Sequence, residues 1–209
     1  RIANSLFNGC INLTSINVHD NIELIESYAF HECQSLQNFT IPPKVTNIQL
    51  RLFSGCSSLS SFKIHDDVDT IASYAFFRCE SLSDFRIPPK VTNIPNSLFS
   101  GCSSLSTIEV YDNIFSIESR AFFSCKSLQN FTVPSKITII PEYVFYRCTS
   151  LSLFKIHNNV EHIGSYSFYM CQSLQNFTIP PKITNISDQL FAECKNLSRI
   201  EIHDNVEYI

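Results

Sequence analysis

The residues most able to do chemistry are nine cysteines, and their spacing is strictly periodic. They stand at positions 10, 33, 56, 79, 102, 125, 148, 171 and 194, each 23 residues from the next. Thiols of this kind could ligate zinc, form disulfides or act as small buried apolar groups. Zinc sites usually draw on closely spaced pairs such as Cys-x-x-Cys, which this spacing never provides. We therefore expect no zinc site at the cysteines.

Disulfides between neighbouring cysteines are compatible with the distance between adjacent turns of a repeat structure. However, the side chains of one column point the same way, and nine is an odd number. We favour a column of free thiols that are buried as small hydrophobic groups. Burial would raise their pKa and leave them unreactive, so they do not indicate the redox compartment.

A column of histidines is the second candidate for chemistry. His19, His65, His157 and His203 occupy one position of the period, and Tyr111 completes the column. Successive members lie two turns apart, roughly 9–10 Å at the spacing of β-strands. One metal ion needs its ligand nitrogens within about 4 Å of each other. We expect these side chains to hydrogen-bond the corners of the chain.

No other constellation indicates catalysis. The chain has four glycines and no glycine-rich phosphate loop, and no Ser-His-Asp set departs from the periodic background. A catalytic group would be expected to break the period. The sequence therefore predicts no enzyme, no catalytic residue, no cofactor and no metal.

A repeat of 23 residues must position all of these side chains. Aligned on cysteine, the unit reads C-x-x-L-x-x-[FI]-x-[IV]-x-x-x-[VI]-x-x-I-x-x-x-x-F-x-x, and the 209 residues hold nine turns. A fixed period in this range is typical of a solenoid, whose stacked units share one core. Residues around Phe39 and Ile41 are expected to form a strand in a parallel sheet. Val45 to Ile48 is a second extended piece, and Ser73 to Phe77 is expected to form one helical turn.

A finer period of 46 residues lies within this repeat. Alternate units turn at His/Asp/Asn corners such as His19-Asp20-Asn21, and the others at Pro-Pro-Lys corners such as Pro42-Pro43-Lys44. The residue before the repeated phenylalanine also alternates between small and large, as in Ala29 and Leu52. This alternation indicates interlocking packing between neighbouring turns.

The segment from Cys79 to Val91, CESLSDFRIPPKV, shows the pattern in full. Together with the following Ile and Phe columns, it resembles the BspA-like (treponemal-type) class of leucine-rich repeats over the whole chain. The His or Tyr that replaces the first Pro in alternate units is a departure from the class. The resemblance implies a leucine-rich repeat solenoid, a β-rich right-handed superhelix or horseshoe of nine turns. A parallel sheet would form one face, with short extended segments and helical turns on the other.

The domain organisation expected is a single leucine-rich repeat domain over residues 1–209. No polar capping repeat stands at either end, so we expect a fragment of a longer array. The net charge of −4 argues against nucleic-acid binding. No run of 18 apolar residues exists, so no membrane insertion by this segment is expected. Six Asn-x-Ser/Thr sequons would permit glycosylation in a eukaryotic secretory pathway.

Exposed strand positions are the best candidates for binding a partner, because they vary while the core does not. Breaks in a column are the sharpest signals: Leu153 stands among polar residues, Tyr111 replaces histidine, and Phe115 replaces an acid or threonine. Aromatic side chains at such positions favour partner binding or pack against a neighbouring corner. The predicted partner-binding residues are Lys63, Arg86, Glu109, Tyr111, Phe115, Leu153, Lys155 and Arg199.

A second surface is formed by aromatic residues that follow the core phenylalanine. Phe77, Phe123, Tyr146 and Tyr169 either pack on one another between turns or form a patch for another chain.

The family resemblance implies surface exposure and adhesion to host proteins or other cells. We therefore expect a non-enzymatic recognition or adhesion module, at the cell surface or secreted, that binds a protein or glycoprotein through its sheet. An intracellular, cytoplasmic scaffold and a passive spacer that carries other domains are the alternatives. The oligomeric state is left open.

Overall fold

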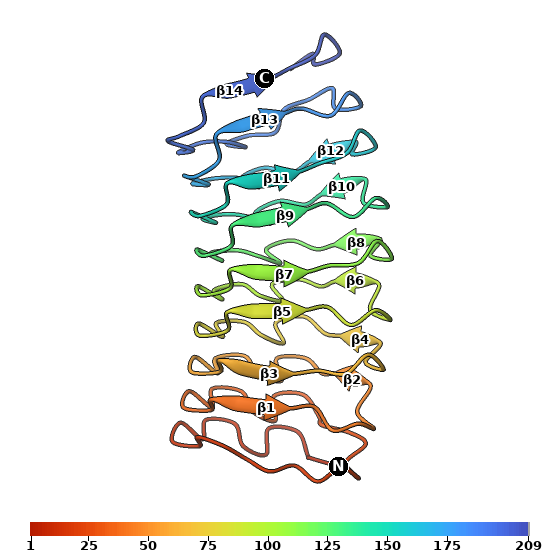
Figure 1. Ribbon diagram of the computed structural model, residues 1–209, viewed down its shortest axis with the longest axis vertical. Coiled ribbons are helices and arrows are strands. Elements are labelled where there is room, and N and C mark those ends of the chain that lie inside the picture. The colour runs from red at the N-terminus through yellow and green to blue at the C-terminus, as the bar shows by residue number, and fades with distance from the viewer. Residues whose placement is uncertain (209) are drawn as a thin grey trace.

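The structure, a computed structural model, describes residues 1–208 as a stack of flat coils that rise along one long axis (Figure 1). Each coil is one 23-residue repeat. The chain runs forward through a short strand, turns a corner, returns through a second short strand and closes through a set of tight turns. The predicted parallel solenoid is confirmed.

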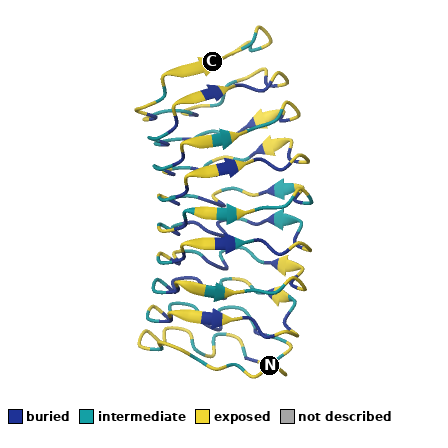
Figure 2. Ribbon diagram, in the orientation of Figure 1, coloured by how far each residue is buried: buried dark blue, intermediate teal, exposed yellow. Residues whose placement is uncertain are grey.

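The first strand column contains eight strands of three residues, one per coil from the second coil onward. In each, the middle side chain points toward the core and the outer two point to solvent, except in the last strand, which is exposed throughout. Figure 2 shows this alternation along the column. These strands are β1 (Asn38–Thr40), β3 (Ser61–Lys63), β5 (Asp84–Arg86), β7 (Thr107–Glu109), β9 (Asn130–Thr132), β11 (Leu153–Lys155), β13 (Asn176–Thr178) and β14 (Arg199–Glu201).

The second strand column contains six strands of two residues on the return path. Its regular pattern is a polar or exposed residue followed by a buried isoleucine. Parallel bridges, Ile2 to Ile25 and Asn185 to Tyr208, extend the column at both ends. These strands are β2 (Asn47–Ile48), β4 (Thr70–Ile71), β6 (Asn93–Ile94), β8 (Ser116–Ile117), β10 (Ile139–Ile140) and β12 (His162–Ile163).

Strand pairing follows the 46-residue period. The parallel pairs are β1–β3, β5–β7, β9–β11 and β13–β14 in the first column, and β2–β4, β6–β8 and β10–β12 in the second. Each pair joins a coil that has a proline corner to the coil after it. The first strand column is therefore divided into hydrogen-bonded pairs, with a seam between one pair and the next.

Two details of the predicted repeat are wrong. The first of the nine coils carries no three-residue strand, and residues 73–77 form a tight turn that is not helical. Tyr74 has a left-handed φ of 59°, and its N–H donates to Asn96 O of the next coil. Phe76 N–H likewise donates to Leu98 O. Alternate N–H groups of this segment therefore bond to the next coil, whereas Ala75 and Phe77 donate locally, to Ala72 O and Tyr74 O.

Aromatic stacking runs through the core. The phenylalanine that ends each repeat, from Phe7 to Phe191, stacks on its equivalent in the next coil with ring centroids 5.3–5.8 Å apart. The seven between them, from Phe30 to Phe168, have no solvent exposure. Since each phenylalanine can fill space only between two others, the period of 23 cannot drift.

The cysteine column lies beside these rings. All nine cysteines are free, and eight of them are buried, from Cys33 to Cys194. Each buried thiol donates to the carbonyl oxygen of the core phenylalanine 26 residues earlier, at 3.0–3.2 Å. Burial raises the pKa of Cys33 and Cys194 to about 11, and raises the pKa of the six between them further. The predicted buried column is confirmed except at Cys10, which is exposed.

Thiol reactivity follows from this burial. At neutral pH, Ellman's reagent is expected to modify Cys10 rapidly and the other eight thiols only after denaturant is added. The measurement is the absorbance of the thionitrobenzoate that is released per mole of protein. Cys10→Ala is the control that removes the rapid phase. Rapid release of several equivalents from the folded protein would contradict the buried column.

The histidine column hydrogen-bonds the corners, as predicted. Nε2 of His157 and of His203 lies 2.9 and 2.8 Å from the carbonyl oxygen of the equivalent proline in the coil before. Nδ1 of each accepts from the N–H of the asparagine two residues on. His65 bonds Pro42 O in the same way. These rings therefore connect each histidine corner to the proline corner of the coil before it.

Candidate functional site

The outward side of the first strand column, here called the strand face, holds six of the eight predicted partner-binding residues. Lys63, Arg86, Glu109, Leu153, Lys155 and Arg199 each occupy the first or last position of a strand. All are exposed except Arg86, which is half-buried. The alternation of strand side chains aims them away from the core. The face extends over several coils and offers a broad surface without a deep cleft.

Arg86 and Tyr111, two of the predicted partner-binding residues, bind each other within the protein. Arg86 Nη1 donates to the Tyr111 hydroxyl at 3.1 Å, and Nη2 is paired with Asp66. These bonds raise the pKa of the Arg86 guanidinium. Three consecutive coils are thereby tied at their corners, so both side chains have a structural role that the sequence pattern did not indicate.

Lys63 and Glu109 flank Arg86 along the face. Glu109 is the register partner of Arg86 in the β5–β7 pair, yet the guanidinium turns to Asp66 and Tyr111 instead. Within residues 1–208, no ion pair involves Lys63, Glu109 or Lys155. These three charges are therefore available to a partner.

Two seams between strand pairs form shallow hollows on the strand face. The hollow between β11 and β13 has a volume of about 430 Å³ and is lined by Lys155, Phe154 and Asn176 among others. The hollow between β7 and β9 has a volume of about 230 Å³ and is lined by Glu109. Leu153, with 53% of its surface exposed, stands on the same strand as Lys155. An apolar side chain, a free ammonium group and a hollow therefore lie side by side.

Phe115 lies apart from this group. It directly precedes β8 in the second strand column, and 59% of its surface is exposed. Ile139 in the neighbouring strand β10 is 55% exposed. The sequence left open whether Phe115 packs against a corner, and in the structure most of its surface is open to solvent. Ile139 also breaks a column that is otherwise mostly polar, which is a signal of exposure that the sequence carries.

Arg199 stands on β14, at the far end of the face. Its guanidinium pairs with Glu201 on the same strand at 2.7 Å, and Thr178 Oγ1 donates to the other carboxylate oxygen of Glu201. The three Asn-Phe-Thr sequons also lie on the strand face, with Asn38, Asn130 and Asn176 exposed. Glycans at these positions would cover part of the face.

The aromatic residues beside the core stack between coils. Phe123, Tyr146 and Tyr169 form a continuous stack with centroids 4.6 and 4.8 Å apart. Tyr143 and Tyr166 form a parallel stack at 4.9 Å, and the Arg120 guanidinium covers Tyr143. Of the two roles considered for this surface, mutual packing between turns is confirmed for Phe123, Tyr146 and Tyr169, whereas Phe77 meets Tyr74 of its own turn edge-on at 5.8 Å.

Residues 1–208 contain no helix, so no segment of them is a candidate for a membrane-crossing helix. Nor do they contain a group of three or more His, Cys, Asp or Glu side chains placed to hold a metal ion.

Known proteins share the sequence pattern and the fold of this chain. The sequence profile of the BspA type leucine rich repeat region matches residues 1–129 and 92–209, in six copies. A search of the curated proteins finds no match.

Solved structures of bacterial leucine-rich repeat proteins are similar in fold. A leucine-rich repeat protein of T. pallidum superposes with a TM-score of 0.67 at 27% identity, over 72% of this chain and 70% of that one. A leucine-rich cell surface protein of Faecalibacterium prausnitzii gives 0.58 at 27% identity, over 95% and 68%. A leucine-rich repeat protein of Eubacterium ventriosum shares the fold at 18% identity, with a TM-score of 0.52 over 84% and 63%. Profile, period and fold agree, and the chain belongs to the BspA-type leucine-rich repeat family.

Proposed function

We propose that this chain is a non-enzymatic adhesion module, displayed at a cell surface, that binds a protein or glycoprotein through its strand face. Repeat proteins of this kind are generally protein-interaction modules, because stacked units present a broad surface whose side chains are free of packing. The F. prausnitzii relative is described as a cell surface protein, which favours the same location here.

The observation that carries the proposal is the group around Leu153. An exposed leucine costs solubility and gives no packing, yet here it stands on the same strand as Lys155, whose charge pairs with no side chain of residues 1–208. The adjoining hollow between β11 and β13 offers space for a partner side chain. An apolar side chain fits the buried centre of a protein interface, and a charged side chain next to it fits the polar rim of that interface.

Arg86 and Tyr111 are less suited to carry the interaction. Their bonds to each other and to Asp66 hold three corners together, so changing them would disturb the scaffold as well as the face. The charges of Lys63 and Glu109 flank them and would contribute mainly to the rate and orientation of encounter.

The test compares two variants that differ in which surface they alter. Leu153→Asp changes the strand face, and Ile139→Asp changes an equally exposed apolar residue of the second strand column. Binding of each purified protein to intact cells and to immobilised cell-surface proteins is measured. Leu153→Asp is expected to weaken binding at least tenfold, while Ile139→Asp leaves it unchanged.

Equal binding by the wild type and Leu153→Asp would remove the strand face from the proposal. Surface display is tested separately, by treating intact cells of the source organism with a protease and following the protein by immunoblot. Protection from the protease in intact cells, with loss after lysis, would favour the intracellular scaffold instead.

A further inference from the structure

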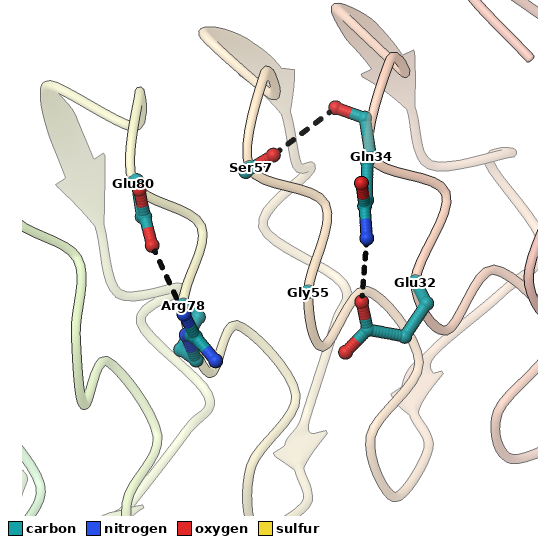
Figure 3. Close-up of a pocket in the computed structure, with 6 residues that line it drawn as sticks. All are labelled: Glu32, Gln34, Gly55, Ser57, Arg78 and Glu80. Carbon is teal, nitrogen blue, oxygen red and sulfur yellow. Dashed lines mark hydrogen bonds and ion pairs between the residues drawn. The ribbon is translucent and has the colours of Figure 1, made fainter. Parts of the chain in front are cut away.

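A polar slot lies on the tight-turn side of the stack, away from the strand face. Three neighbouring coils build it (Figure 3). One outer coil supplies Glu32 and Gln34, and the other supplies Arg78 and Glu80. The middle coil supplies only Gly55 and Ser57, so a hollow of about 210 Å³ opens between two charged walls.

Gly55 is the reason that the slot exists. Its φ is +80°, and a Cβ built on it would lie 2.5 Å from Glu32 Oε1. Gly9 and Gly101 stand at the equivalent position of two other coils, while further coils carry long side chains there with φ near 60°, as at Arg147 and Met170. The left-handed conformation therefore does not by itself require glycine, and the missing side chain leaves room into which the Glu32 carboxylate bends.

The charges in the slot are not balanced. Gln34 Nε2 donates to Glu32 Oε2 at 3.2 Å, but no cationic side chain of residues 1–208 pairs with Glu32. Arg78 Nη2 lies 3.7 Å from Glu80 Oε1 on the opposite wall. Two carboxylates and one guanidinium leave the lining with a charge of −1. A single cation would balance it, and two carboxylates on opposite walls are too few to hold a metal ion.

We propose that this slot binds the guanidinium group of an arginine side chain on a partner protein. A planar guanidinium fits between two walls of stacked coils, and it can donate two parallel N–H bonds to the Glu32 carboxylate. The Gln34 amide and the Ser57 hydroxyl supply acceptor oxygens for the remaining N–H groups. Glu80 adds negative charge from the far wall. The site is independent of the strand face, so it provides a second point of attachment.

The test uses the full chain and the blocked amino acid N-acetyl-arginine-N-methylamide as the probe. Binding is followed by the amide chemical shifts of Gly55 and Ser57 in a titration. The citrulline analogue, which has the same shape without the charge, is expected to bind at least tenfold more weakly. Free arginine is the third arm, and it should bind no more tightly than the blocked form.

Two variants and one matched control complete the design. Gly55→Ala places a methyl group where the Glu32 carboxylate lies and so displaces that carboxylate, and Glu32→Gln removes the charge without adding bulk. Each is expected to weaken binding at least tenfold. Gly9→Ala makes the same change at a left-handed glycine, φ +74°, that has no atom within 4 Å of its built Cβ, and should bind as the wild type does.

Equal shifts with the citrulline probe, or full binding by Glu32→Gln, would overturn the guanidinium site. Free arginine that binds tenfold more tightly than the blocked form would identify a free amino acid, not a partner side chain, as the ligand. These outcomes are separate from the test of the strand face, which involves no residue of the slot.

Discussion

Raising the pH from 8 to 10 is expected to unfold this protein, because its buried thiols can lose their protons only in the unfolded state. Eight thiols are buried, and burial raises their pKa above the ordinary value of 9.0, to about 11 for Cys33 and Cys194. In the unfolded chain the same thiols lose their protons near pH 9. The folded state therefore binds more protons at high pH, and its stability falls as the pH rises above about 9. The fall ends near pH 11 for Cys33 and Cys194 and continues to higher pH for the six thiols between them.

The expected effect is large because the thiols act together. Each contributes about 1.4 kcal/mol of lost stability per pH unit above the unfolded pKa. Eight thiols at pH 10 sum to about 11 kcal/mol, which is comparable to the whole stability of a typical domain. Below pH 8 this term is absent, since the thiols are protonated in both states.

Urea unfolding followed by circular dichroism, at several pH values and with reductant present, measures this dependence. Replacing one buried thiol, as in Cys102→Ala, should make the fall with pH shallower by one thiol's share, about 1.4 kcal/mol per unit. Cys10→Ala is the matched control at the exposed position. An unchanged urea midpoint between pH 8 and pH 10 would mean that the thiols are not interior.

The period of the sequence was enough to predict the cysteine and phenylalanine columns. Side chains that recur every 23 residues stack on their own kind, so Cys102 and Phe99 could be assigned to the core before any coordinates. Cys10 differs because it lies in the first of the described coils, where no earlier coil of residues 1–208 covers it. Burial at an end depends on a neighbour, and no pattern within one repeat contains that information.

The helical turn was predicted wrongly because local preference was considered alone. Ser73 to Phe77 suits a helix by residue type, but a helix would spend its N–H groups within the segment. In the solenoid, Tyr74, Phe76 and Arg78 donate to the next coil, and two of these donors, Tyr74 and Arg78, have a left-handed φ. Hydrogen bonding between coils repeats along the whole stack, and it outweighs the preference of one short segment.

The candidate sites show the same limit. Columns identify which side chains are exposed, as at Lys63 and Leu153, but they do not say where a long side chain turns. Arg86 passes its register partner Glu109 and reaches Asp66 and Tyr111 on neighbouring coils. The slot at Gly55 had only a partial signal in the sequence, because Gly9 and Gly101 stand in the same column. The charged side chains on either side of Gly55 became evident only from the structure.

The phenylalanine stack gives the second large prediction, a loss of about 3–5 kcal/mol in the free energy of unfolding for Phe99→Ala. Phe99 has no solvent exposure, and it stacks on Phe76 and Phe122 at 5.8 Å on either side. It also meets Phe85 edge-on at 4.9 Å. Removing the ring leaves a cavity that its neighbours cannot close, because the hydrogen bonds between coils hold their spacing. Urea unfolding at pH 7 measures the loss.

Phe115→Ala is the matched control, because it removes the same side chain from a position that is 59% exposed. Its expected effect is within about 0.5 kcal/mol, since the ring leaves no cavity behind. The difference between the two variants isolates packing from any effect on the unfolded chain. A loss of less than about 1 kcal/mol in the free energy of unfolding for Phe99→Ala would mean that neighbouring coils can move together and close the cavity. The phenylalanine stack would then not set the 23-residue period.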